Sequence, residues 1–121
     1  MHATNDLVHT YLRSWNEIDP LRRRALVEQV WTEHARYTDP MVQVQGWQGI
    51  EATIAAVQGM FPDYRFELDG AVDAHHDIVR FRWLLRAPNG ETPVAGFDVA
   101  ELDQGLIHRV HGFLDKVPQA T

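Results

Sequence analysis

The sequence predicts an α+β domain in which three N-terminal helices pack on the concave face of one curved antiparallel sheet. In the first half of the chain, apolar residues recur at three- and four-residue steps, as in amphipathic helices. From residue 64 onward they alternate with polar residues, as in strands. Turn sequences at 88–90 and 103–105 divide this second half into consecutive antiparallel strands. Together these patterns predict a cone-shaped domain with an apolar mouth.

Size and composition indicate one ordinary globular domain, residues 1–121, with a single core. Hydrophobic residues make up 45% of the chain, and no apolar stretch approaches the roughly 20 residues of a membrane helix. The formal net charge of -6 argues against a nucleic-acid partner, and the absence of cysteine excludes thiol chemistry. The N-terminal residues do not resemble a secretion signal, so a cytoplasmic location is expected.

Two helices are expected at the start of the chain. The first begins near Thr4, and its apolar stripe contains Leu7, Val8, Tyr11, Leu12, Trp15 and Ile18. Asp19 and Pro20 supply an N-cap and a first-turn proline for the second helix. The inward-facing residues of this helix are expected to be Leu21, Ala25, Leu26 and Val30. The basic run 22–24 is expected to be a solvated face.

After Trp31 the sequence predicts short extended segments at 35–38 and 42–45, separated by Asp39-Pro40, because a residue before proline avoids the helical region. Glycines at 46 and 49 precede a third helix over 50–60, which Pro62 ends. The remaining strands are expected at 64–68, 78–87, 92–102 and 106–114.

Asp98 lies in the middle of a strand that is almost wholly apolar on both faces. Desolvation disfavours the charged form of a carboxyl group. Asp98 is therefore expected to stay protonated well above a pKa of about 3.9 and to act as a hydrogen-bond donor. A neutral buried acid of this kind is a typical catalytic group. Asp98 is thus the leading candidate for a catalytic residue.

Tyr11 and Asp39 are the other polar side chains set among apolar neighbours, and we expect them to share a pocket with Asp98. Taken alone, Asp39 fits a turn former as well as it fits a catalytic residue, and Tyr11 fits an ordinary core residue. The residues expected to line the substrate pocket are Trp15, His34, Tyr37, Trp47, Met60 and Trp83, with Trp47 at its mouth. The histidines have no shared-face spacing for a metal, so no metal site is expected.

The layout of nearly the whole chain resembles the NTF2-like superfamily, which includes SnoaL-like polyketide cyclases and ketosteroid isomerases. Residues 9–19 resemble the first helix of the isomerases, 39–42 resemble their Asp-Pro-Val segment, and Asp98 lies on the strand that carries their buried acid. The resemblance implies a cystatin-like α+β barrel. It also implies that Asp39 removes a proton beside a carbonyl while Tyr11 and neutral Asp98 donate hydrogen bonds to the enolate oxygen.

Other activities on the same fold stay open. SnoaL-like cyclases similarly use one aspartate on the equivalent strand for aldol closure, a role that Asp98 alone could fill. Residues 80–83 lack the Arg-x-Asp of limonene-epoxide-hydrolase relatives, which disfavours epoxide hydrolysis. The expected function is therefore cofactor-independent proton transfer on an apolar carbonyl compound of steroid or polyketide type, as an isomerase or aldol-type cyclase. The alternative is a protein that binds an apolar small molecule without catalysis. Apolar positions on the outer sheet face predict a homodimer.

Overall fold

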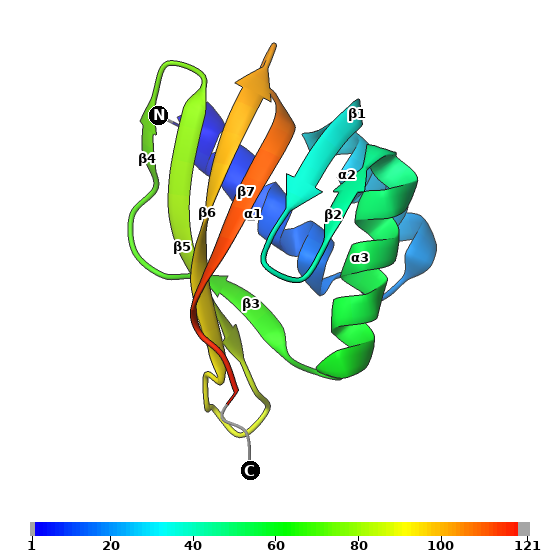
Figure 1. Ribbon diagram of the computed structural model, residues 1–121, viewed down its shortest axis with the longest axis vertical. Helices are drawn as coiled ribbons and strands as arrows, with labels where there is room; N and C mark the ends of the chain where they lie inside the picture. The colour runs from blue at the N-terminus through cyan, green and yellow to red at the C-terminus, as the bar shows by residue number, and fades with distance from the viewer. Residues whose placement is uncertain (1, 119–121) are drawn as a thin grey trace.

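The computed structural model describes residues 2–118 as three helices and one mixed, mostly antiparallel sheet of seven strands (Figure 1). The N-terminal half contains α1 (His2–Asn16), α2 (Pro20–Val30), β1 (Trp31–Thr38), β2 (Gln43–Gln45) and α3 (Gly46–Met60). The C-terminal half contains β3 (Arg65–Leu68), β4 (Asp73–His75), β5 (Ile78–Arg86), β6 (Val94–Asp103) and β7 (Leu106–Lys116). This arrangement confirms the predicted α+β class.

The strand order is β2-β1-β7-β6-β5-β3, with β4 also paired to β5. Every pair is antiparallel except β1 and β7, which are parallel, so the expected antiparallel sheet is mixed at this one position. Strand β1 follows a helix rather than a tight hairpin, and its direction is therefore not determined by a neighbouring turn. Figure 1 shows α1 crossing one face of the sheet and α3 lying beside β1 and β2.

The N-terminal helices bury fewer of the predicted residues than the sequence pattern indicated. Helix α1 ends at Asn16, whose side chain pairs with the Phe66 backbone at 2.7 and 3.0 Å, and Ile18 beyond it is 79% exposed. In α2, Leu21 is 83% exposed and Ala25 is also exposed. The buried residues of α2 are Arg23, Leu26, Val27 and Val30.

Arg23 is buried because its guanidinium finds polar partners between the helices. It donates to Gln58 Oε1 at 2.9 Å and lies 3.4 Å from the Glu17 carbonyl. The run 22–24 is therefore not uniformly a solvated face, since its central residue is only 7% exposed. The aliphatic stem of an arginine packs well in such a position.

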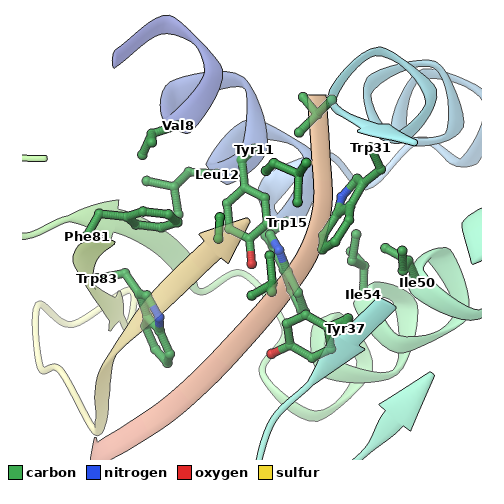
Figure 2. Packing of buried hydrophobic residues seen from close by; sticks show 14 of the residues in the cluster. Val8, Tyr11, Leu12, Trp15, Trp31, Tyr37, Ile50, Ile54, Phe81 and Trp83 are labelled. Carbon is green, nitrogen blue, oxygen red and sulfur yellow. The ribbon is translucent and has the colours of Figure 1, made fainter. Parts of the chain in front are cut away.

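Helix α3 begins four residues earlier than predicted, at Gly46 instead of residue 50. A Cβ on Gly49 would approach Val44 Cβ to 3.2 Å. This glycine therefore allows close packing of α3 on β2 and does not mark a loop. The core lies between the helices and the concave side of the sheet, where Tyr11 packs edge-on against Phe81 at 5.4 Å (Figure 2). No helix in the described part of the chain is long and apolar enough to cross a membrane.

Candidate functional site

A cavity of about 390 Å³ opens between α1, the end of α3 and the inner face of the sheet. Six aromatic residues line it, namely Tyr11, Trp15, Tyr37, Phe61, Phe66 and Trp83. Most of the remaining lining residues are aliphatic, and Asp39 and Asp98 are the only charged residues among them in the described part of the chain. The cavity therefore suits an apolar ligand with a small polar group directed at the two acids.

Asp98 is 4% exposed and lies on β6 between Phe81 of β5 and Gly112 of β7. The Tyr11 hydroxyl donates to its Oδ2 at 2.7 Å, and the Trp83 indole N–H donates to its Oδ1 at 3.1 Å. The pKa of Asp98 is raised from 3.8 to about 6 because of burial. The two hydrogen bonds lower the pKa, but their effect is smaller than that of burial. Asp98 therefore keeps its proton to a higher pH than a free aspartate does, and its two oxygens accept hydrogen bonds where a donor was expected.

Tyr11 is brought to Asp98 by the apolar stripe of α1, which buries its ring to 1% exposure. Burial, and then the charge of Asp98, raise the pKa of the Tyr11 hydroxyl well above its usual value of 10. The hydroxyl therefore keeps its proton and serves as a hydrogen-bond donor inside the cavity. Figure 2 shows the Tyr11, Trp15, Tyr37 and Trp83 side chains gathered in this region from α1, β1 and β5.

Asp39 is both a turn residue and a cavity residue. Its Oδ1 accepts from the backbone N–H groups of Met41 at 2.8 Å and Val42 at 3.0 Å, which closes the turn after β1. Its Oδ2 accepts from the Tyr37 hydroxyl at 2.7 Å. Burial, and then the charge of Asp98, raise the pKa of Tyr37. Asp39 and Tyr37 thus form a second acid–phenol pair beside Asp98 and Tyr11.

Gly112, which the sequence analysis missed, allows the two pairs to lie next to each other. A Cβ at this position would lie 3.0 Å from Asp98 Oδ1, 3.2 Å from Asp39 Cβ and 3.4 Å from the Tyr37 hydroxyl. These three groups therefore surround the space that a side chain on β7 would fill. A glycine in the interior of a strand is the signal that could have revealed this close approach.

Most of the predicted site residues come together. Tyr11, Asp39 and Asp98 line one cavity with Trp15, Tyr37, Met60 and Trp83. The cavity also contains residues that were not predicted to line it, which are Leu12, Met41, Val57, Phe61, Phe66, Leu85, Val94, Leu114, Val117 and Pro118. Strand alternation could have indicated Phe66, Leu85 and Val94, whereas Val117 and Pro118 follow the last strand and carry no pattern.

His34 and Trp47 do not line the cavity, and both expectations were wrong. His34 is exposed on β1, where a register shift between Trp31 and Arg36 changes the alternation of faces. Trp47 lies in the first turn of α3, donates to the Trp31 carbonyl at 3.0 Å, and packs under the Arg24 guanidinium at 5.7 Å. The glycine-flanked segment is helical and not a loop, and the hydrogen bond of Trp47 fixes the first turn of α3 to β1.

Among the side chains that the structure describes, no group of three His, Asp or Glu residues is arranged to hold a metal ion. The cavity residues support hydrogen bonding by two acids and two phenols, with proton exchange at Asp98. The pKa of about 6 for Asp98 places its proton exchange near neutral pH.

The chain is similar in sequence and fold to known proteins. Residues 8–110 match the profile of the SnoaL-like domain. A proposed isomerase of the SnoaL-like family from Agrobacterium tumefaciens str. C58 is 46% identical, and its structure covers 95% of this chain and 99% of its own length at a TM-score of 0.90. No protein of curated function matches the chain significantly.

Two more distant structures share the fold. A proposed SnoaL-like polyketide cyclase from Jannaschia sp. CCS1 is 20% identical, covering 92% of this chain and 86% of the other at a TM-score of 0.72. A proposed ketosteroid isomerase from Kribbella flavida DSM 17836 is 18% identical, covering 99% and 83% at a TM-score of 0.72. Because the profile match spans residues 8–110 and one relative is 46% identical, the chain belongs to the SnoaL-like domain family of the NTF2-like superfamily.

Proposed function

We propose that the protein is an enzyme that moves a proton at a carbon beside the carbonyl group of an apolar, uncharged compound. The observation that carries the proposal is a buried carboxyl group with a pKa of about 6 in a cavity that is otherwise almost wholly apolar. An acid/base catalyst works best when its pKa lies near the working pH, because it must both accept and return a proton.

In the proposed reaction Asp98 is the acid/base. Ionised Asp98 takes a proton from the carbon beside the carbonyl, so that a C–H bond breaks, an O–H bond forms and the substrate becomes an enolate. Protonation of Asp98 weakens its hold on the Tyr11 hydroxyl, which can then donate to the enolate oxygen. Asp98 then returns its proton, either to a second carbon, which isomerises a double bond, or to the alkoxide that forms when the enolate carbon attacks another carbonyl.

Asp39 has a supporting role in this proposal. It already accepts three hydrogen bonds, whereas Asp98 accepts two, so Asp98 retains more free acceptor capacity. After burial, the negative charge of Asp39 also contributes to raising the pKa of Asp98. Asp39 therefore adds to the effect of burial, which is the larger cause, and makes Asp98 bind a proton more readily.

The proposal is tested with exchange of carbon-bound hydrogen, which requires no knowledge of the natural substrate. The protein is mixed with a small cyclic ketone in D2O, and loss of the proton signal beside the carbonyl is followed by NMR. We expect the wild type to accelerate exchange and Asp98→Asn to lower the rate at least about 100-fold, the lower end of what a positioned acid/base contributes. The wild-type rate should rise with pH through about 6, as Asp98 ionises.

Asp103→Asn is the matched control, because Asp103 ends the same strand, is exposed, and does not line the cavity. Affinity for the ketone is measured in parallel by calorimetry. Retained binding with lost exchange in Asp98→Asn supports catalysis by Asp98. A wild type that binds the ketone without accelerating exchange contradicts the proposal and favours a protein that only binds apolar ligands.

A further inference from the structure

We infer that the substrate is longer than the buried cavity, and that its far apolar end lies on a rim formed by Met41, Met60 and Val117. This inference rests on the proposed function, because it takes the carbonyl end of the substrate to lie at Asp98. It takes the apolar carbonyl compound of the proposed function as the substrate and assigns the residues that select for the length of its apolar part.

The three rim residues are exposed although they are apolar. Met41 is 76% exposed, Met60 62% and Val117 54%, and all three line the cavity. They account for three of the seven large apolar side chains that are exposed in the described residues. Apolar side chains that gather at the mouth of a cavity, instead of being scattered, indicate a surface that is covered during function.

The rim is built from three separate segments of the chain. Met41 belongs to the turn after β1, Met60 is the last residue of α3, and Val117 follows the end of β7. Only the tertiary structure brings them together around one opening. Methionine is unbranched and flexible, so two methionines can adapt to a ligand whose shape varies outside the buried part.

The exposed fractions also give the direction in which the substrate lies. Asp98 and Tyr11 are 4% and 1% exposed, whereas the rim is more than half exposed, so the polar end of the cavity is its buried end. The volume of about 390 Å³ is near the lower limit for ligand sites, so a large substrate cannot be fully enclosed. The part that remains outside meets an apolar surface that continues directly from the cavity wall.

The experiment uses a homologous series of straight-chain methyl ketones, each longer by one methylene, and measures their affinities by calorimetry. For the wild type we expect affinity to rise about fourfold with each added methylene, including members too long for the buried cavity. In Met41→Ser/Met60→Ser the increase in affinity should stop at a shorter chain length than in the wild type, which is judged from the ratio of affinities of successive ketones within each protein. The rim assignment is overturned if both proteins show the same length dependence.

Ile18→Ser/Leu21→Ser is the matched control, because these residues are 79% and 83% exposed and do not line the cavity. It should keep the wild-type length dependence. Exchange of the protons beside the carbonyl is measured on the shortest ketone in the same proteins. If the wild type does not accelerate exchange, the proposed function is overturned. The rim is still supported in that case if affinity stops rising at a shorter chain length in Met41→Ser/Met60→Ser than in the wild type. Normal exchange with an unaltered length dependence overturns the rim alone.

Discussion

Asp98 is a buried acid whose two hydrogen bonds do not fully replace its lost hydration. Its pKa in the folded protein, about 6, lies above the 3.8 of the free side chain, and burial is the largest cause. The folded state therefore binds this proton more tightly than the unfolded state does. The charged form that the proposed reaction needs is consequently a form that lowers stability, as is common for groups that carry function.

The pH dependence of stability tests this reading of Asp98. Because the folded pKa is raised, the stabilising effect of its proton is fully present below about 3.8 and is lost as the pH rises through about 6. The difference between the two pKa values corresponds to a loss of about 3 kcal/mol in the free energy of unfolding at neutral pH, relative to acid pH. Urea unfolding of the wild type and Asp98→Asn across this pH range measures this loss. The variant should become more stable relative to the wild type as the pH rises. A difference between the two proteins that does not change with pH contradicts the assignment.

Strand β7 has no side chain at Gly112, and this leaves room for Asp98 and Asp39 to lie near each other. The register places Gly112 opposite Asp98, and the Cβ that Gly112 lacks would lie within 3.4 Å of groups from Asp98, Asp39 and Tyr37. Strand β7 therefore contributes to the site by leaving space. Residues of β1 and β6 can approach one another across it although a strand lies between them in the sheet.

Gly112→Ala should lower the free energy of unfolding by about 1–3 kcal/mol, because the added methyl overpacks the space between the acids. Urea unfolding measures the change, and the pH profile of ketone exchange should shift as Asp98 moves away from Asp39. Gly59→Ala is the control, since a Cβ there meets nothing within 4 Å and alanine favours the helix that contains it. Equal stability of the two variants shows that the space at Gly112 is not required.

At the scale of the whole molecule, the face of the sheet that points away from the helices has an apolar centre of its own. Phe97 of β6 and Phe113 of β7 stack at 4.9 Å with an angle of 10° between their rings, and Phe113 is 48% exposed. Neither ring lines the cavity. We therefore still expect a homodimer in which a second copy of the chain covers this face.

Sedimentation equilibrium tests the dimer. Phe113→Lys places a charge in the centre of the proposed contact, and we expect it to shift the protein from dimer to monomer while ketone affinity stays unchanged. Leu21→Lys serves as the comparison, because Leu21 is 83% exposed on α2, far along the chain from the stacked pair. A wild type that is monomeric at all concentrations contradicts the expectation.

Local sequence patterns were sufficient to predict the class of the fold and the burial of its leading acid, but not the direction of that acid's hydrogen bonds. The helical and strand periodicities predicted the order of the elements except β4, because each of the others has to bury one regular face. The three residues of β4 are all exposed and show no such pattern. The same alternation placed Asp98 among apolar neighbours, and the structure shows its carboxyl buried with a raised pKa. Errors such as Ile18 and Leu21 occurred at element ends, where a periodic pattern continues but the packing does not.

The tertiary structure alone decided which side chains surround the cavity. Trp47 and His34 were plausible neighbours from their positions in the chain, but helix packing and a strand register shift directed them elsewhere. Met41 and Val117 carry little signal in the sequence, because their roles depend on segments that meet only after folding. The glycine at 112 marks a close approach, but the sequence does not show which groups meet there. Periodicity records which face of an element is buried, whereas the shape of a cavity depends on contacts between residues far apart in the chain.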